Sequence, residues 1–174
     1  MKIGIDISQA AYEGTGVANF LINLIEELTK KPDIDLVLFY SSLGNYSKTL
    51  PFSVKAKVRL KRFPFPPWIL DILWNRWHII PIERFIGSVD VFISSDWTQP
   101  PVSSGKSATI LYDLIIYKFP RETDAGIVAV QKRKISWSKQ ECDLLICISE
   151  ATRKDAIEIL GIPEQKLKVV HPGM

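Results

Sequence analysis

The sequence predicts an α/β fold: a Rossmann-like three-layer domain with a mainly parallel sheet and helices on both faces. Short apolar segments of strand length alternate with segments whose apolar residues recur at helical spacing. A loop that carries Gly14 and Gly16 also follows the first apolar segment and opens a helix, as in folds that bind anions at a helix N-terminus. Strands joined by helices pair in parallel, so we expect both faces of the sheet to be covered.

The composition fits one globular domain. The chain has 174 residues, of which 47% are hydrophobic and 24% are charged. Its net charge of +3 is too small to indicate a nucleic-acid binder, which usually has a concentrated basic face. Cys142 and Cys147 lack the spacing of a zinc or redox pair. We interpret them as small buried hydrophobes of a cytoplasmic protein.

The first third of the chain predicts two core strands, one helix and one edge strand. In the helix, apolar residues recur three and four positions apart, and acidic residues occupy the opposite face. The last segment alternates apolar with basic residues, as an exposed edge strand does. The predicted elements are strands 2–7 and 36–40, helix 17–28 and edge strand 54–60.

The rest of the chain predicts four further core strands separated by helices. Segments 68–77 and 123–140 have helical patterns, and another helical segment begins at Pro81 and ends near Gly87. Ser149 is expected to cap a helix that ends before Gly161. The predicted strands are 90–93, 108–112, 143–148 and 167–170.

In such sheets the ligand lies beyond the carboxyl ends of the strands, so polar residues that follow strands are candidates for its site. The first candidates are Gly14, Thr15 and Gly16. Glycines let a backbone approach a phosphate closely, and the first amides of the next helix are free to donate. The alternative is a strand-to-helix turn that needs glycine only for its shape.

Asp113 is the candidate catalytic residue, because a carboxylate at a strand end can accept a substrate hydroxyl or act as a base. The alternative is an aspartate that shapes a turn or caps a helix. Tyr112 either stacks on a sugar or fills the wall of the crevice. Ser149 and Glu150 follow another predicted strand and are further candidates for substrate binding.

Asp96 and Trp97 follow a third predicted strand and form a pair suited to sugars. The carboxylate can accept sugar hydroxyl groups, and the indole can pack on the C–H faces of the ring. The alternative for Asp96 is an Asx-type turn before Pro100.

No cofactor motif is present. A dinucleotide fingerprint would need a glycine at Asn19, and the Gly105-Lys106-Ser107 run of a Walker A motif would need to precede a helix rather than a strand. No His, Asp, Glu and Cys cluster has metal-ligand spacing, so we expect neither a metal nor a cofactor. We interpret His78 as a packing residue and His171 as a linker residue.

Segment 55–84 mixes Lys and Arg with Phe and Trp. Such a mixture can lie on an anionic membrane surface, with the aromatic rings at the level of the headgroups. The alternative is a core-facing helix beside a solvated edge strand, which the pattern of a half-buried helix favours. Prolines at 64, 66 and 67 exclude one long amphipathic helix across the segment.

Three stretches of the chain together match a known pattern. They are Ile3-Gly4-Ile5-Asp6 with Gly14-Thr15-Gly16-Val17-Ala18-Asn19; Thr109-Ile110-Leu111-Tyr112-Asp113-Leu114; and Ile148-Ser149-Glu150-Ala151-Thr152-Arg153-Lys154-Asp155, continued by Leu160-Gly161-Ile162-Pro163 and Val170-His171-Pro172-Gly173. These stretches resemble the N-terminal half of GT-B glycosyltransferases of the retaining family 4 group, and the resemblance spans nearly the whole chain.

The resemblance implies that residues 1–174 form the N-terminal, acceptor-side domain of a hexosyltransferase. It implies transfer with retention, without a metal, from a nucleotide-sugar donor to a glycan or lipid-linked acceptor in polysaccharide biosynthesis. The loop at Gly14–Gly16 would approach the donor diphosphate. A C-terminal donor-binding domain would be the partner; we expect it to be absent from this chain and the chain alone to be inactive.

One departure from the family pattern limits what the resemblance implies. The family's His-Asp pair is Tyr112-Asp113 here, so Asp113 keeps its place but a role that needs imidazole does not pass to Tyr112.

The expected location is the cytoplasm, including the inner face of the membrane. A non-catalytic, membrane-associated binding module that uses segment 55–84 is the alternative function.

Overall fold

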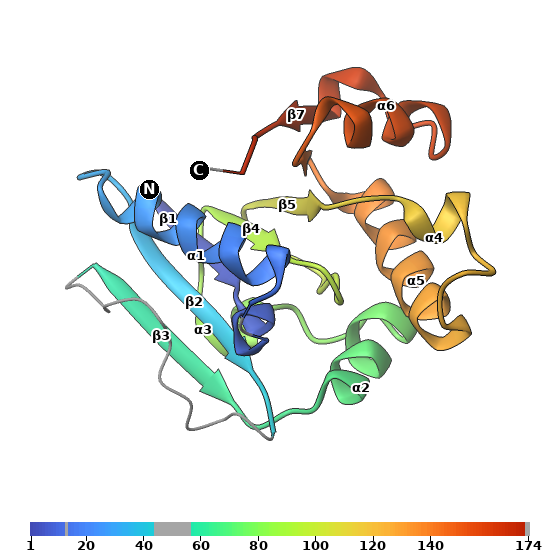
Figure 1. The fold of residues 1–174 in the computed structure, drawn as a ribbon. Helices are drawn as coiled ribbons and strands as arrows, with labels where there is room; N and C mark the ends of the chain where they lie inside the picture. The colour runs from blue at the N-terminus through green and yellow to red at the C-terminus, as the bar shows by residue number, and fades with distance from the viewer. Residues whose placement is uncertain (13, 44–56, 173–174) are drawn as a thin grey trace.

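The computed structural model describes residues 1–12, 14–43 and 57–172 (Figure 1). Within them, seven parallel strands form one sheet in the order β3-β2-β1-β4-β5-β6-β7. The strands are β1 Lys2–Asp6, β2 Asp35–Ser41, β3 Val58–Phe63, β4 Val91–Ser94, β5 Lys106–Leu111, β6 Leu144–Cys147 and β7 Leu167–Val169. The predicted Rossmann-like α/β fold is confirmed.

Helices follow the strands as the sequence predicts. Those described are α1 Gly16–Thr29, α2 Pro67–Leu70, α3 Glu83–Ile86, α4 Ile115–Lys118, α5 Ala125–Glu141 and α6 Glu150–Glu158. Gly87 and Gly161 lie at helix ends with φ of 77° and 63°, which confirms the two predicted stops. The sequence analysis missed the short elements Ser8–Ala11, Ile115–Lys118 and Glu164–Lys166.

The central strands bury both faces. In β2, Leu38 joins the core under α1, whereas Phe39 joins a second core with Trp74 and Ile86 on the opposite side of the sheet. Successive side chains of a strand point to opposite faces, so a strand covered on both sides is apolar throughout. The Phe39 and Trp74 side chains are each 0% exposed, which confirms the predicted helical layers on both faces.

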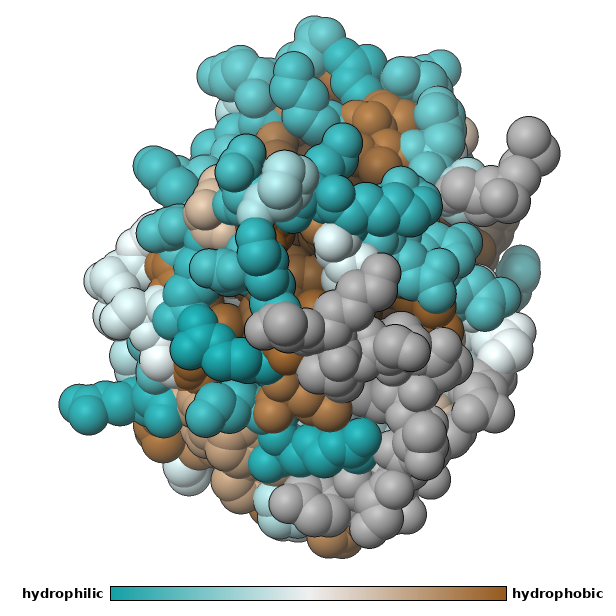
Figure 2. All heavy atoms as spheres, turned by 90° about the vertical axis from the view of Figure 1, so that its left-hand side faces the viewer, coloured by the Kyte–Doolittle hydropathy of each residue, from teal (hydrophilic) through white to brown (hydrophobic). Residues whose placement is uncertain are grey.

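The edge strand β3 lies at one end of the sheet, next to β2. Exposed Arg59 and Lys61 flank the half-buried Leu60 in it, which agrees with the predicted edge strand; residues 54–56 of that prediction lie outside the described residues. Figure 2 views the molecule from this side, where hydrophilic and hydrophobic side chains are interspersed between the grey atoms.

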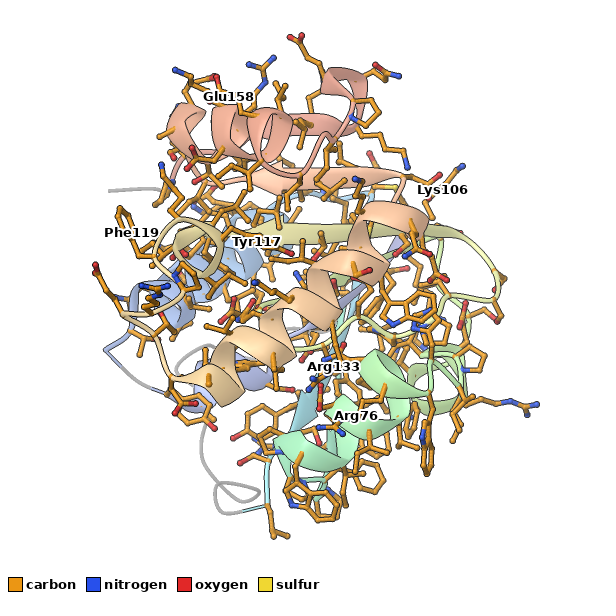
Figure 3. All side chains as sticks on the ribbon, turned by 90° about the vertical axis from the view of Figure 1, so that its right-hand side faces the viewer. Arg76, Lys106, Tyr117, Phe119, Arg133 and Glu158 are labelled. Carbon is orange, nitrogen blue, oxygen red and sulfur yellow. The ribbon has the colours of Figure 1, made fainter. Side chains whose placement is uncertain are left out.

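The predicted helix 68–77 is present, but it changes character midway. α2 ends at Leu70 and continues as a π-helix, Asp71–Arg76, in which Trp77 N donates to Ile72 O. Asp71 is 7% exposed and pairs with Arg76 in this element and with Arg133 of α5. Figure 3 shows the two arginines between α5 and the α2–π-helix segment, which Asp71 therefore connects.

The strand order reverses between β1 and β4. β2 and β3 extend the sheet on one side of this point, and β4 to β7 extend it on the other. Connections therefore leave β1 and β4 in opposite directions, which opens a crevice at the carboxyl ends of these two strands. The fold thus places the candidate site next to Asp6 of β1 and Ser94 of β4.

Candidate functional site

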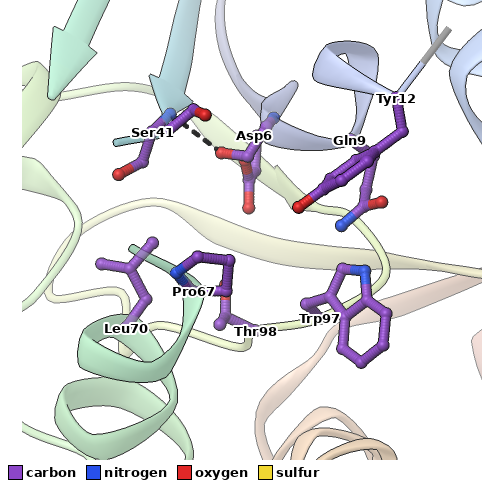
Figure 4. A pocket seen from close by; sticks show the side chains of 10 residues that line it. Asp6, Gln9, Tyr12, Ser41, Pro67, Leu70, Trp97 and Thr98 are labelled. Carbon is purple, nitrogen blue, oxygen red and sulfur yellow. Dashed lines mark hydrogen bonds between the residues drawn. The ribbon is translucent and has the colours of Figure 1, made fainter. Parts of the chain in front are cut away.

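A small hollow of about 30 Å³ lies at the reversal point, between the end of β1 and the segment that follows β4 (Figure 4). Asp6 ends β1 and is 5% exposed; its Oδ1 accepts hydrogen bonds from Ser8 Oγ at 2.6 Å and Ser8 N at 2.9 Å. Burial raises the pKa of the Asp6 carboxyl, against the lowering effect of these hydrogen bonds. The Tyr12, Trp97 and Thr98 side chains also line this hollow.

A second hollow, of about 280 Å³, brings together three of the predicted site residues. Asp96, Tyr112 and Asp113 line it from the ends of β4 and β5. Trp97 lines both hollows, so they are neighbours along the same crevice. A hollow of this size, with an indole and two carboxylates, matches the chemistry of a sugar ring, whose hydroxyl groups surround apolar C–H faces.

Asp96 is half-buried in the hollow, whereas Asp113 is exposed. Burial raises the pKa of Asp96, while the positive charge of Lys134 and a hydrogen bond with Gln131 oppose this rise. Asp113 is exposed, and its Oδ1 accepts the Ile115 N–H at 3.0 Å, so it shapes the turn into α4 as the structural alternative proposed. Because that bond uses one carboxylate oxygen, it leaves Asp113 able to accept a further hydrogen bond.

Tyr112 forms part of the wall. Its ring is 9% exposed and packs edge-on against Phe20 of α1, with 5.8 Å between the ring centroids. Its hydroxyl lies 3.4 Å from Ser95 Oγ, and burial raises the pKa of the phenol above its usual value. Tyr112 therefore stays neutral at physiological pH, and of the two predicted roles its geometry matches the filling of the crevice wall.

Val17, in the first turn of α1, lines the second hollow, whereas the predicted Gly14, Thr15 and Gly16 are not among its lining residues. Gly14 has φ of 79°, a conformation that favours glycine, and Thr15 caps α1 because its Oγ1 accepts the Ala18 N–H at 3.2 Å. The N-terminus of α1, which carries partial positive charge, therefore lies beside the hollow that Asp96 and Asp113 line.

Ser149 and Glu150 lie beside the hollow rather than among its lining residues. Ser149 Oγ caps α6 by accepting the Thr152 N–H at 3.1 Å, as predicted. Glu150 is exposed, and its carboxylate lies 3.5 Å from the Arg153 guanidinium. Thr152 Oγ1 donates to the carbonyl oxygen of Tyr112 at 3.0 Å, so the start of α6 supports the crevice wall from behind.

The main residue that the sequence analysis overlooked is Lys134. It is 1% exposed, and its Nζ donates to Thr109 Oγ1 at 2.6 Å beneath the crevice. Asp6 was also overlooked as a candidate, although an acidic residue at the end of an apolar strand is a usable signal. Lys134 has no such signal, since it follows Lys132 and Arg133 in a run that reads as a solvated helix surface.

His78 and the two cysteines have packing roles, whereas His171 lies at the surface. His78 stacks on Trp137, with 3.7 Å between the ring centroids, and both cysteines are buried, in agreement with the packing roles predicted for them. His171 is exposed and lines a separate hollow with Phe20 and Leu24.

The described residues contain neither a metal-ligand cluster nor a membrane-spanning helix. Across residues 1–12, 14–43 and 57–172, no three His, Cys, Asp or Glu side chains gather as metal ligands. The helices in these same ranges are all too short or too polar to cross a bilayer.

The comparison with family models gives one match. A model described as Glycosyltransferase Family 4 matches residues 14–174, which include Gly14, Asp96, Tyr112, Asp113 and Ser149. No curated protein matches the chain. The matched region starts at the glycine loop and contains both hollows' shared residue, Trp97.

Proposed function

Because the chain belongs to glycosyltransferase family 4, we propose that it is the N-terminal, acceptor-side domain of a GT-B enzyme that transfers a hexose with retention. The donor is a nucleotide sugar, and the acceptor is a glycan or lipid-linked glycan of polysaccharide biosynthesis. A second, donor-binding domain of the same protein closes over the crevice. The observation that carries the proposal is the 280 Å³ hollow lined by Asp96, Trp97 and Asp113 beside the N-terminus of α1.

The acceptor sugar lies in this hollow in the proposed complex. Asp96 accepts hydrogen bonds from its hydroxyl groups, and the Trp97 indole packs on a C–H face of the ring. The exposed Asp113 orients the attacking hydroxyl and can take up its proton. The loop at Gly14–Gly16 and the positive end of α1 stabilise the diphosphate of the donor, which becomes more negative as the sugar leaves.

No metal or cofactor takes part in the proposed reaction. The nucleotide sugar is a co-substrate, and the N-terminus of α1 supplies the positive potential that its diphosphate needs. The reaction would run in the cytoplasm or at the inner face of the membrane, where a lipid-linked acceptor would be presented.

The test is sugar transfer by the whole protein that contains this chain. Labelled nucleotide sugars with glucose or mannose are offered with glycan acceptors, for the wild type and for Asp113→Asn. We expect transfer by the wild type and a loss of at least about 100-fold in kcat/KM in the variant, the usual scale for a positioned acid–base group. Asp143→Asn is the matched control, because Asp143 also accepts a backbone N–H, that of Ser107, but at the amino end of the strands. Absence of transfer from every donor tried would refute the proposed activity.

A second candidate function is a membrane-associated binding module. One observation favours it: Trp77, Ile79 and Ile80 are 65%, 44% and 40% exposed in a loop where His78 and Ile80 have φ of 52° and 62°. A β-branched residue in this left-handed region is strained, and such strain often accompanies function. Of the other aromatic residues of segment 55–84, Trp74 is buried in the core, as the structural alternative for this segment predicted, and Phe63 and Phe65 pack against that core. Trp68, by contrast, is 62% exposed.

Vesicle co-sedimentation separates the two candidates. If the loop binds membranes, wild-type protein should sediment with anionic vesicles at low salt, and the double variant Trp77→Ser/Ile79→Ser should sediment less. Ile159→Ser is the control, because Ile159 directly follows α6 and is 40% exposed, close to the 44% of Ile79. Equal sedimentation of all three proteins would exclude the loop as the membrane contact.

A further inference from the structure

The buried side of α5 carries a polar row next to the apolar Ile135, which packs in the core. Gln131, Lys134 and Ser138 lie three and four residues apart and therefore share one face of the helix. Gln131 reaches the second hollow, whereas Lys134 and Ser138 are 1% and 0% exposed beneath it. Helices that cover a sheet normally present apolar residues to it, so this buried polar row needs a specific explanation.

The row continues into a buried hydrogen-bond network. Lys134 Nζ lies 2.6 Å from Thr109 Oγ1 and 3.4 Å from the carbonyl oxygen of Ile110. Ser94 Oγ lies within hydrogen-bond distance of both Thr109 Oγ1 and Gln99 Oε1, at 2.7 Å and 2.5 Å. The ammonium of Lys134 is therefore connected, through β4 and β5, to both ends of the segment that carries Asp96 and Trp97.

The charges around Lys134 come from several elements. Asp6 faces it from the end of β1, Asp96 from the segment after β4, and Cys142 from the end of α5. Tyr112 and Asp113 lie next to Asp96 at the end of β5. Among these groups, Asp96 exerts the largest attraction on the lysine. Burying an ammonium destabilises the folded protein unless such partners compensate the loss of hydration.

We propose that Lys134 is a positioning residue of the acceptor site: through this hydrogen-bond network its buried ammonium holds the Asp96–Trp97 segment against α5, and its charge favours the ionised form of Asp96. The consequence for acceptor binding rests on the proposed function, in which an ionised Asp96 accepts hydrogen bonds from the acceptor hydroxyl groups. The lysine itself does not contact substrate; it acts through the carboxylate above it.

Burial lowers the pKa of Lys134 to about 8, against the attraction of Asp96, Cys142 and Asp6. The lysine is therefore charged at neutral pH and loses its charge as the pH rises through about 8.

The test compares Lys134→Met, which keeps the length of the side chain without its charge, with Lys134→Arg, which restores a cation. Lys132→Met is the control, because Lys132 is exposed on the same helix and lies over the Tyr117 ring. The pKa of Asp96 is followed by carboxyl 13C NMR without any substrate. We expect it to rise in Lys134→Met and to return toward the wild-type value in Lys134→Arg, with no change in the control.

An unchanged pKa of Asp96 in folded Lys134→Met would overturn the inference, whatever the outcome of the transfer assay. If Lys134→Met does not fold, the reciprocal variant Asp96→Asn decides. Loss of the neighbouring charge should lower the pKa of Lys134 below about 8 in a 15N side-chain titration. A titration of Lys134 that is the same in the wild type and in Asp96→Asn would equally overturn the inference.

Discussion

The side-chain amide of Asn75 donates a hydrogen bond of 2.9 Å to the carbonyl oxygen of Trp97. The amide oxygen of the same residue accepts the Gln99 N–H at 3.0 Å, so Asn75 holds both sides of the turn that presents Trp97 to the crevice. Asn75 is 2% exposed and belongs to the π-helix. The unusual helix therefore has a definite structural consequence: it places one side chain to fix the backbone of a candidate substrate-binding segment.

Replacement of Asn75 should therefore affect stability and acceptor binding together. Asn75→Ala leaves the Trp97 carbonyl and the Gln99 N–H buried without these partners, at a cost of about 1–3 kcal/mol for each group. Urea unfolding measures this loss, and the acceptor KM should rise severalfold in the whole protein. Gln140→Ala, which removes a side-chain amide from an exposed position on α5, is the control and should change neither quantity.

The support of Tyr112 by Thr152 gives a second prediction. Thr152→Val keeps the shape of the side chain but removes the hydroxyl that donates to the Tyr112 carbonyl at 3.0 Å. The expected destabilisation is about 1–3 kcal/mol, and Thr152→Ser should recover most of it because it retains the hydroxyl. Chemical denaturation of the three proteins is the measurement; equal stability of the Val and Ser variants would contradict this role of the hydroxyl.

The parts of the fold that local patterns determine were predictable. The continuous apolar run of β2, the cap of α6 at Ser149 and the stop at Gly161 each depend on residues close together in sequence. Sequence also placed Asp96, Tyr112 and Asp113 at strand ends, and parallel pairing then brings such ends together.

The parts that depend on distant residues were not predictable. Lys134 is charged and sits in a basic run, and partners that are far away in sequence, such as Thr109 and Asp96, make its burial tolerable. The π-helix likewise forms where Asp71 meets Arg133, a residue 62 positions further along the chain. In both cases a local pattern suggests a surface or a regular helix, and a tertiary contact decides otherwise.

Gly14 and Gly16 form a matched pair that separates the two interpretations of their loop. An added Cβ meets no atom within 4 Å at either position, but only Gly14 has a positive φ, of 79°. The free energy of unfolding of Gly14→Ala should therefore be about 1 kcal/mol lower than that of the wild type, because of backbone strain. That of Gly16→Ala, at the start of α1, should be about 0.4–1 kcal/mol higher, because alanine restricts the unfolded chain.

The activity of Gly16→Ala in the whole protein then decides the role of the loop. If the backbone approaches the donor diphosphate there, the added methyl group should lower kcat/KM although the fold is at least as stable. If glycine serves only the shape of the turn, thermal stability and activity should both be maintained. Steady-state kinetics and thermal unfolding of the same preparation measure the two quantities.

The ion pairs of Asp71 predict how stability depends on acid. Burial by itself would raise the pKa of Asp71, but hydrogen bonds from Arg133, Asn75 and Arg76 outweigh it and lower the pKa below its usual value. A carboxyl whose pKa is lower in the folded state stabilises the protein above its unfolded pKa of about 3.9. That stabilisation is lost as the pH falls through the lower, folded pKa.

Asp71→Asn should therefore lower the free energy of unfolding by roughly 3 kcal/mol at pH 7, the lower end for breaking a buried ion pair. Below about pH 4 the difference in stability between the variant and the wild type should shrink. Asp143→Asn is the comparison, because hydrogen bonding to Lys106 also lowers the pKa of Asp143. This pair lies on the surface: the Asp143 side chain is 43% exposed and that of Lys106 is 71% exposed. Such a surface pair contributes at most about 1 kcal/mol. The midpoints of urea unfolding are measured for both variants from pH 2 to pH 7, about the range over which carboxylates titrate. If the two variants depend on pH in the same way, Asp71 does not anchor the π-helix to α5.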